Sequence, residues 1–542
     1  MRKPDKLKGL VYKDCLRVIV PALCWYIPCM IIGRLLSTYI AGALGSFADA
    51  VFQLNFSYGL QNVWKLLVAV GGSVLFVPAL DCIGQFFDLA GALRYDRTIL
   101  SHYLDKQYAK AVSIGEGEVV TRLEQDGIDF RCYLTVICMK LVSLPVTLAY
   151  LLYHALGISL LFTGIVFLIS MVKLAVPIAV RKLQARYDKW EREYRASVRE
   201  CENEMTHGTH IVKMYGLSDA FLKRFDRMYQ DFFRNVFRKS AACTVIAEQV
   251  LSFLDTFCVL LILLAGALLV SVGDISAGAV VAMTGYFSVF NDLIGQVDDV
   301  VRKVPMVKNL AERMGLFYED AQILDGKPIG TVHTVVAENL SFSYGQNTVF
   351  EKVSFSVALG SKTAICGPNG SGKSTLIKLL SGLLNGYGGS LRVNGTELRD
   401  VAAEQWCTQF AYAPQDPYLF EGTVKENVRL GNLSAGDDVI EKLMHQLGIS
   451  HLADRQVSSQ SSEFSGGEKQ RISIARALAK GTEFLILDEP GNNLDGQTAE
   501  WLQAFISSCD KTVIFISHDG QLLHSADSLI QMTGGATHDL LF

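Results

Sequence analysis

The sequence predicts two domains of different fold class: an all-α transmembrane domain with six spans, followed by an α/β domain built on a parallel sheet. At 542 residues the chain is too long for one ordinary core. Half of its residues are hydrophobic and only 19% are charged, and in the first half the charges lie between long apolar runs. The second half alternates strand-like and helix-like patterns instead. The small net charge of -4 gives no reason to expect a nucleic-acid partner.

Six apolar segments within residues 1–317 are long enough to cross a bilayer as helices. A cleaved signal peptide is the competing interpretation of the first segment, but the apolar run is longer than that of a typical signal. We therefore expect six spans, at residues 18–41, 66–84, 133–153, 156–180, 241–270 and 276–293.

The distribution of Lys and Arg between these segments predicts the orientation of the spans. The short connections at 42–62, 154–155 and 271–275 contain neither residue, whereas 85–132 and 181–240 are long and rich in both. By the positive-inside rule, the long segments and both termini are expected in the cytoplasm. The second long segment has no proline and a helical spacing of apolar residues, so we expect it to continue membrane helices into the cytoplasm.

Six ionisable residues lie within or near the predicted spans, and Lys140 is one of them. Because a charge in hydrocarbon is costly, each should face a partner or a watery cavity. Lys173, Glu248 and Asp292 are expected on cytoplasmic extensions of the helices. Arg34 and Asp255 lie deeper by count, so we expect them to line a translocation path and to influence the charge of the substrate.

A glycine-rich loop lies between an apolar run at 362–366 and a helical pattern at 376–384. Its glycines let the backbone turn so that successive N–H groups point inward, and the following helix adds the positive charge of its N-terminus. Lys373 can reach the outer phosphates of a nucleotide, and the Ser374 hydroxyl can coordinate Mg²⁺. A chance match is expected in on the order of a few per cent of chains this long. The predicted phosphate-binding loop consists of Gly367, Pro368, Asn369, Gly370, Ser371, Gly372, Lys373, Ser374 and Thr375.

Two acidic residues follow the apolar strand pattern at 484–487. Asp488 is placed to hold Mg²⁺ through water, and Glu489 to orient or deprotonate the water that attacks a phosphate. An acidic pair after a strand can instead cap a helix, but a phosphate loop earlier in the chain favours the catalytic interpretation.

A second sequence suited to an anion precedes the helical run at 470–480. Ser465, Gly466 and Gly467 would form the N-terminus of that helix. One chain does not need two such sites for a single nucleotide.

Taken in order, these stretches resemble the full motif set of ATP-binding cassette (ABC) proteins, in which a P-loop NTPase domain of α/β fold binds the nucleotide. The set also includes Tyr344, Gln415 and His518. The resemblance implies that two such domains pack head to tail, so that the phosphate loop of one and Ser465-Gly466-Gly467 of the other enclose each ATP. It also implies that Tyr344 stacks on adenine, Gln415 contacts Mg²⁺ and senses the membrane domain, and His518 holds the γ-phosphate.

The first half, fused ahead of one cassette, resembles a half-transporter of the exporter fold (type IV). Gly117-Glu118, Arg122 and Asp126 match the recurrent stretch of the first cytoplasmic loop of that family. Residues 204–216 resemble the coupling helix of the second loop, which in the family reaches the partner's cassette. We therefore divide the chain into a transmembrane domain at 1–317, a linker at 318–331 and an ABC nucleotide-binding domain at 332–542.

The chain departs from the family pattern near two motifs. The signature begins with Phe464 rather than Leu, has Glu468 where Gln is usual, and lacks a Glu-Arg-Gly element at 455–463. After Glu489, Asn492-Asn493 replaces the familiar Ser-Ala. These departures concern the coupling of the two domains more than hydrolysis.

The resemblance implies an ATP-hydrolysing transporter protomer that uses ATP and Mg²⁺ to alternate between inward-open and outward-open states, most simply for export. An importer of siderophore-type substrates and an ATP-gated channel or regulator are the alternatives. A second half-transporter is the expected partner. An intact Glu489 and Ser465-Gly466-Gly467 favour a homodimer over a heterodimer. We expect the chain in a bacterial plasma membrane, and the motifs do not identify its substrate.

Overall fold

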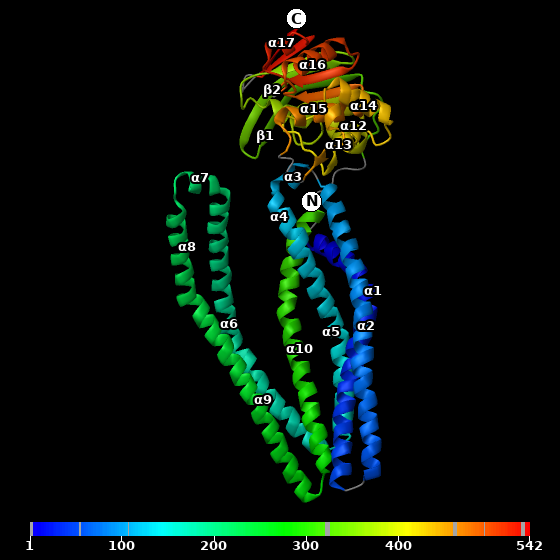
Figure 1. Cartoon of the computed structure of the whole chain (residues 1–542), viewed down its shortest axis with the longest axis vertical. Coiled ribbons are helices and arrows are strands. Elements are labelled where there is room, and N and C mark those ends of the chain that lie inside the picture. The colour runs from blue at the N-terminus through cyan, green and yellow to red at the C-terminus, as the bar shows by residue number, and fades with distance from the viewer. Residues whose placement is uncertain are drawn as a thin grey trace. The chain divides into compact units, whose positions relative to one another are not determined.

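The computed structural model describes residues 4–53, 56–106, 108–319, 326–458, 463–492, 494–532 and 537–541. The chain forms two compact units. The transmembrane unit comprises residues 2–101 and 120–318, and the cassette unit comprises residues 102–119 and 319–542 together with Met1 (Figure 1). Residues 320–325 of the predicted linker lie outside the described residues, and 318–319 and 326–331 are described.

Among the described residues, six long helices form most of the transmembrane unit. In the described residues, five stretches are long and apolar enough to cross a membrane, at Leu7–Phe52, Val63–Leu104, Gly117–Leu156, Arg238–Val272 and Ala277–Tyr318. They contain the predicted first, second, third, fifth and sixth spans. The predicted fourth span falls on α6, whose described apolar part is Leu160–Met171. The six helices are α1 (Pro4–Phe52), α2 (Phe56–Leu104), α5 (Gly127–Leu156), α6 (Leu160–His207), α9 (Arg238–Val272) and α10 (Ala277–Gly315).

The short connections differ from their predicted positions. The predicted turn at 154–155 is helical, because α5 continues to Leu156. The chain reverses at Gly157–Ser159 instead, where the Ser159 hydroxyl caps α6 by accepting a hydrogen bond from the Phe162 N–H at 3.3 Å. Most of the predicted connection at 42–62 is also helical. The prediction missed this because the length of an apolar run corresponds to the thickness of the hydrocarbon layer, whereas a helix can continue beyond that layer.

Helices α6 and α9 extend beyond their apolar parts and form an arm with two short helices between them (Figure 1). These are α7 (Thr209–Met214) at the tip and α8 (Ser218–Phe232), which joins α9 through a π-helical turn at Phe233–Phe237. The predicted helical continuation through 181–239 is therefore confirmed. At the tip, Met214 and Tyr215 leave more than two thirds of their surface exposed.

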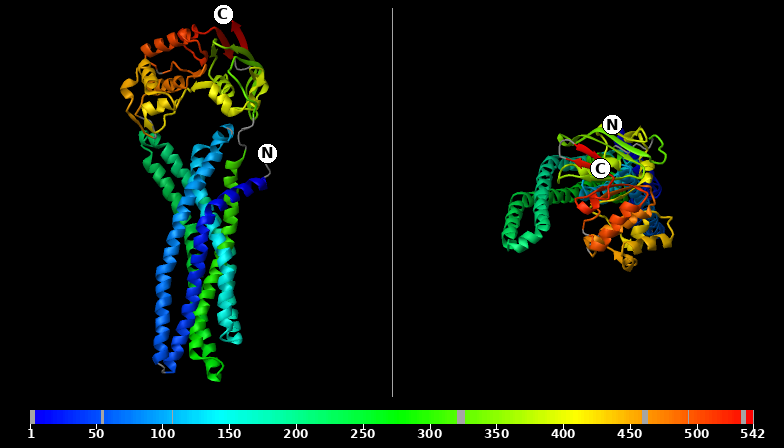
Figure 2. Two further views of the ribbon diagram at one scale, coloured as in Figure 1. Left: turned by 90° about the vertical axis from the view of Figure 1, so that its right-hand side faces the viewer. Right: turned by 90° about the horizontal axis from the view of Figure 1, so that it is seen from above.

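Helices α1 and α10 run side by side (Figure 2). They approach closely at Gly45 and Gly278, where a Cβ atom on Gly278 would lie 2.0 Å from the Gly45 carbonyl oxygen. Nearby, the Asp49 carboxylate accepts hydrogen bonds from the Ser276 hydroxyl at 2.7 Å and the Gly278 N–H at 2.6 Å. Small residues thus bring two helices into backbone contact, as is common in membrane proteins.

Several of the predicted intramembrane charges have partners on neighbouring helices. Arg34 of α1 forms an ion pair with Asp292 of α10. The expectation that Asp292 lies on a cytoplasmic extension is therefore wrong, because it meets Arg34 in the middle of the predicted first span. Asp255 of α9 accepts a hydrogen bond from Asn291 at 3.1 Å. The side chain of Lys173 lies outside the described residues. An influence of Arg34 and Asp255 on the substrate stays a prediction.

The cassette unit contains two main sheets and a short pairing of β7 (Gly422–Thr423) with β8 (Gln456–Val457). One sheet is antiparallel, in the order β2 (Asn347–Ala358), β1 (Thr334–Tyr344), β4 (Gly388–Val393) and β5 (Thr396–Glu397). The larger is parallel except at one edge, in the order β12 (Thr537–Leu541), β11 (Ser528–Met532), β3 (Lys362–Cys366), β10 (Thr512–Ile516), β9 (Phe484–Asp488) and β6 (Phe410–Ala413). The predicted α/β class with a parallel sheet is confirmed.

Helices cover both faces of the larger sheet. Along β9, Ile486 packs into a core with Leu376 and Leu379 of α11 (Lys373–Leu380), whereas Leu485 and Leu487 point to the opposite face. There they meet α15 (Gly466–Ala479). This alternation follows from the two-residue period of a strand. The remaining helices are α3 (Tyr108–Ser113), α12 (Ala403–Gln409), α13 (Val424–Arg429), α14 (Asp437–Gln446), α16 (Gly496–Ser508) and α17 (Gly520–Leu523) in this unit, and α4 (Glu116–Thr121), which leads into the transmembrane unit through the π-helical turn Arg122–Asp126.

Candidate functional site

The order of the parallel strands brings four distant sequence motifs to one edge of the sheet. Strands β3, β10, β9 and β6 are consecutive neighbours and run in the same direction. Their carboxyl ends therefore lie together, which is where open α/β sheets bind ligands. The phosphate loop follows β3, His518 follows β10, Asp488 ends β9, and Gln415 follows β6.

The phosphate loop depends on glycine at several positions. Gly367, Gly370 and Gly372 have φ values of 150°, 81° and 95°. A Cβ atom would lie 2.2 Å from the Met532 carbonyl oxygen at Gly367, and 2.8 Å from the Phe350 ring at Gly372. Only glycine fits this backbone without displacing the neighbouring strand.

The Lys373 side chain folds back over the loop. Its Nζ atom donates to the carbonyl oxygens of Gly367 at 2.8 Å and Pro368 at 3.0 Å. The Ser371 hydroxyl is buried and has no hydrogen-bond partner in the described part of the chain. A buried hydroxyl without a partner at the centre of a loop of N–H donors suits a bound anion.

The other predicted loop residues lie around this centre. Asn369 and Gly370 are exposed, and Ser374 and Thr375 lie half-buried in the first turn of α11. Tyr344 ends β1 with 48% of its surface exposed, and its ring contacts Phe342 edge to face at 5.0 Å. The exposed ring is available for stacking against a planar ligand.

Asp488 is almost completely buried, at 3% exposure. Burial, together with the neighbouring Glu489 charge, raises its pKa to about 6, although hydrogen bonding with Tyr412 and the nearby Lys378 act in the opposite direction. One of its carboxylate oxygens, Oδ1, has no hydrogen-bond partner among the described residues. A buried carboxylate with a free oxygen is a natural ligand for a hard cation.

Glu489 is the point at which the predicted catalytic residues meet. Its carboxylate accepts a hydrogen bond from Gln415 Nε2 at 2.9 Å and lies 3.7 Å from His518 Nε2. Its φ of 48° is uncommon for a residue with a side chain, and its N–H donates to the Ile516 carbonyl oxygen at 3.1 Å. This strained backbone aims the carboxylate at the edge of the sheet where the loop lies.

A fourth contact to Glu489 was not predicted from the sequence. The Asn492 side-chain amide donates to Glu489 Oε2 at 2.5 Å, on the same oxygen that Gln415 reaches. Asn492 stands where the family pattern has Ser. This difference from the family was the only sign in the sequence that position 492 has a special contact. The Tyr412 hydroxyl, which contacts Asp488, had no such signal.

Replacing Asn492 with Ser, the residue usual in the family, is expected to lower the kcat of ATP hydrolysis by about tenfold, because a hydrogen bond to a charged carboxylate is lost. The KM for ATP should stay within about twofold, since Asn492 contacts only Glu489. Steady-state kinetics of both proteins measure this. An unchanged kcat would show that Asn492 does not position Glu489.

The signature residues form a well-capped helix start. The Ser465 hydroxyl accepts from the Glu468 N–H at 3.3 Å, and the Glu468 carboxylate accepts from the Ser465 N–H at 2.7 Å. The Ser465 backbone hydrogen bond lowers the pKa of Glu468, so a glutamate is well suited to this position. Gly466 and Gly467 are the first residues of α15. Helix α15 packs on one face of the larger sheet, whereas α11, which follows the phosphate loop, packs on the other.

Two regions of the chain match known protein families. Residues 114–294 match the ABC transporter transmembrane region, and residues 350–492 match the ABC transporter family. The uncharacterized ABC transporter ATP-binding protein YknV of Bacillus subtilis is 27% identical over 352 residues, which cover 61% of this chain and 58% of YknV. The mitochondrial ATP-dependent permease MDL1 of Schizosaccharomyces pombe is 26% identical over 507 residues, 84% of this chain and 67% of the permease.

The fold extends the match over nearly the whole chain. A solved bacterial Atm1-family ABC exporter with ATP bound has a TM-score of 0.79, with 18% sequence identity and 94% coverage of both chains. A transmembrane region and a nucleotide-binding cassette are thus fused in one chain, in the order found in exporters of this fold. The chain belongs to the ABC transporter family, as a multi-pass membrane protein with one transmembrane region and one nucleotide-binding domain.

Proposed function

We propose that this chain is one protomer of an ATP-driven exporter, in which ATP binding and hydrolysis switch the membrane helices between inward-open and outward-open states. The observation that carries the proposal is the convergence of Gln415, Asn492 and His518 on the Glu489 carboxylate, next to the buried Asp488. Such an arrangement is suited to phosphoryl transfer to water.

Each residue of the cluster has a proposed role. Glu489 accepts the proton of the attacking water, and Gln415 and Asn492 hold its carboxylate in place. Lys373 exchanges its contacts with the loop carbonyls for contacts with the outer phosphates. His518, beside Glu489, holds the γ-phosphate.

Three residues would hold Mg²⁺. Asp488 offers its unpartnered Oδ1, Ser374 its hydroxyl in the first turn of α11, and Gln415 its amide oxygen, since its amide nitrogen is used by Glu489. These are the oxygen ligands that Mg²⁺ prefers. A bound Mg²⁺ supplies positive charge that offsets the negative charge on the transferred phosphate.

We propose that two protomers form the working transporter. Support comes from the packing of α15 and α11 on opposite faces of the larger sheet, which suits a signature that meets a partner's loop. The exposed apolar side chains of Met214 and Tyr215 at the tip of the arm also suit a partner. Because this chain has both Glu489 and Ser465-Gly466-Gly467, we propose a homodimer in a bacterial plasma membrane, with both termini in the cytoplasm.

The test is Mg²⁺-dependent ATP hydrolysis by the chain purified alone in lipid vesicles, followed by uptake of candidate substrates into inverted vesicles. We expect hydrolysis that stops when EDTA removes Mg²⁺, and accumulation against a gradient. Accumulation in the opposite orientation would identify an importer, and flux only down a gradient would identify a channel. Absence of hydrolysis by the chain alone would contradict the homodimer.

Replacement of Tyr344 by Ala is expected to weaken ATP binding by about 1–3 kcal/mol, because an aromatic platform for the adenine is lost. Titration with a fluorescent ATP analogue measures this. Tyr418→Ala is the matched control, since Tyr418 is 64% exposed in the same unit. Equal affinities of the two variants would argue against stacking on Tyr344.

A further inference from the structure

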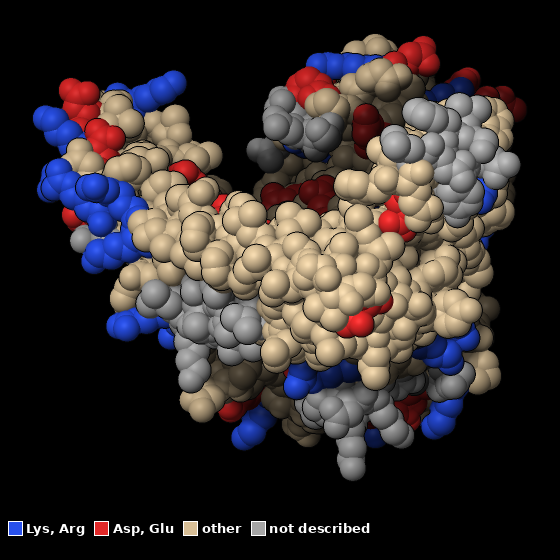
Figure 3. Space-filling view, turned by 90° about the horizontal axis from the view of Figure 1, so that it is seen from below, with Lys and Arg blue, Asp and Glu red and all other residues tan. Residues whose placement is uncertain are grey.

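The transmembrane unit contains a cavity of about 690 Å³ that no part of the proposed function uses. It lies where α1 ends, α5 turns into α6 and α10 begins, and we call this the outer end because the charge distribution predicts that it faces away from the cytoplasm. A space-filling view from this end shows few Lys, Arg, Asp or Glu side chains near its centre (Figure 3). The volume is in the range of small-molecule sites.

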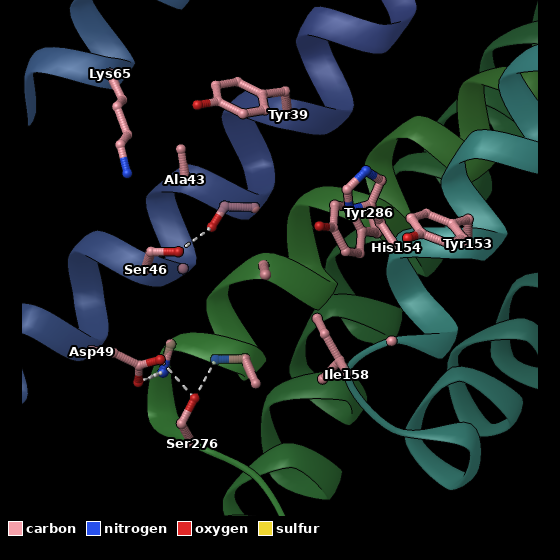
Figure 4. Close-up of a pocket in the computed structure, with 16 residues that line it drawn as sticks. Tyr39, Ala43, Ser46, Asp49, Lys65, Tyr153, His154, Ile158, Ser276 and Tyr286 are labelled. Carbon is pink, nitrogen blue, oxygen red and sulfur yellow. Dashed lines mark hydrogen bonds between the residues drawn. The ribbon is translucent and has the colours of Figure 1, made fainter. Parts of the chain in front are cut away.

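Polar groups of different helices face one another across this cavity. Lys65 of α2 and Tyr39 of α1 lie on one side, and Tyr286 of α10 with Tyr153 and His154 of α5 lie on the other (Figure 4). Lys65, three phenol rings and an imidazole thus offer hydrogen-bond donors together with apolar ring surface. Such a set suits an organic molecule that carries a negative charge.

The charges of the cavity favour an anion over a cation. Asp49, the acidic residue of the lining, already accepts hydrogen bonds from Ser276 and Gly278 at the N-terminus of α10, whose positive end offsets its charge. Lys65 forms no hydrogen bond or ion pair with any residue that the structure describes. An ammonium group at a cavity wall without a counter-ion attracts a negatively charged ligand.

The sequence also predicts that the cavity lies at the depth of lipid head groups. Trp64 and Lys65 occupy the positions expected of interfacial anchors, at the outer border of the predicted second span. The cavity follows α1 from Asp49 to Tyr39, a length of about 15 Å because a helix rises about 1.5 Å per residue. The Ala43 side chain lies on its wall (Figure 4).

We propose that this cavity binds an organic anion, with Lys65 as its counter-ion and the tyrosines of the wall around its body. The proposal goes beyond ATP-driven export, because binding requires no nucleotide. The anionic group could belong to a soluble molecule or to a lipid, and the experiment separates these two sources.

The experiment is calorimetric titration of the full chain in phosphatidylcholine nanodiscs, without nucleotide, with two water-soluble anions. One probe is 3-phenylpropionate and the other is dihexanoyl phosphatidylglycerol. We expect wild type to bind at least one, and Lys65→Gln to weaken that binding about tenfold or more, whereas Lys65→Arg retains it. Tighter binding of 3-phenylpropionate identifies a soluble anion, and tighter binding of the lipid identifies a head group.

Two further variants keep the outcome interpretable. Ala43→Phe fills the cavity without changing its charge and should weaken binding of both anions, whereas Lys189→Gln, on an exposed part of α6, should not. Neutral 3-phenylpropanol should bind at least tenfold more weakly than its anion. Absence of binding by wild type, or equal binding by wild type, Lys65→Gln and Ala43→Phe, would overturn the proposal. ATP hydrolysis is measured separately, so loss of one result does not imply loss of the other.

Discussion

Replacement of Glu489 by Gln is expected to abolish turnover of ATP while ATP binding persists. A glutamine keeps the size of the side chain and can still accept the hydrogen bond that Gln415 donates at 2.9 Å, but it cannot take a proton from water. We expect the rate of Mg²⁺-dependent hydrolysis to fall by a factor of about 10² to 10⁴. Phosphate release measures the rate, and titration with an ATP analogue measures the affinity.

The matched control for this variant is Glu483→Gln. Glu483 precedes the same strand, but its side chain is exposed and its ion pair with Lys511 is long, at 3.9 Å. This control should hydrolyse ATP as wild type does. Full hydrolysis by Glu489→Gln would remove Glu489 from its proposed role, whereas loss of ATP binding would indicate damage to the site as a whole.

Replacement of Gly278 by Ala is expected to destabilise the transmembrane unit strongly. The added methyl group would lie 2.0 Å from the Gly45 carbonyl oxygen and 2.4 Å from the Asp49 carboxyl carbon, so α1 and α10 must move apart. Overpacking of this kind costs about 1–3 kcal/mol or more, and separation of the helices also breaks the hydrogen bonds to Asp49. We expect the midpoint of thermal unfolding in detergent to fall by roughly 5 °C or more.

Gly71→Ala provides the matched control within the same unit. Gly71 lies in α2, and a Cβ atom there would meet nothing within 4 Å. Because Ala favours a helix over Gly, the unfolding midpoint of this variant should stay the same or rise. If the unfolding midpoint fell equally for both variants, the loss of stability would come from replacing any glycine in these helices and not from the contact of α1 with α10.

Local motifs explain why the fold class and the phosphate loop were predictable. The loop 367–375 is continuous in sequence, and Asp488 and Glu489 are adjacent, so their spacing alone indicates their chemistry. The parallel sheet then brings Gln415 and His518 to the same edge. The order of the motifs along the chain could therefore predict which residues form the site, although it could not predict the distances between them.

Contacts between side chains on different elements were not predictable in this way. The pairing of Arg34 with Asp292 depends on how α1 and α10 rotate against each other, and apolar length carries no information on rotation. Similarly, the turn at Gly157–Ser159 depends on a cap, whereas the predicted turn, which begins three residues earlier, followed hydropathy alone. The contact of Asn492 with Glu489 needs the strained backbone of Glu489, which no pattern in the sequence reports.

The packing of the signature helix and the helix of the phosphate loop on opposite faces of the sheet has a consequence for inheritance. If each ATP is enclosed by residues of two protomers, one altered allele impairs the sites that it shares with normal subunits. A cell that makes wild-type and Ser465-altered chains together would then lose more transport than the altered fraction alone, because most dimers would contain at least one altered subunit. Such mutations should behave as dominant in a cell with two copies of the gene, whereas mutations that prevent folding should behave as recessive.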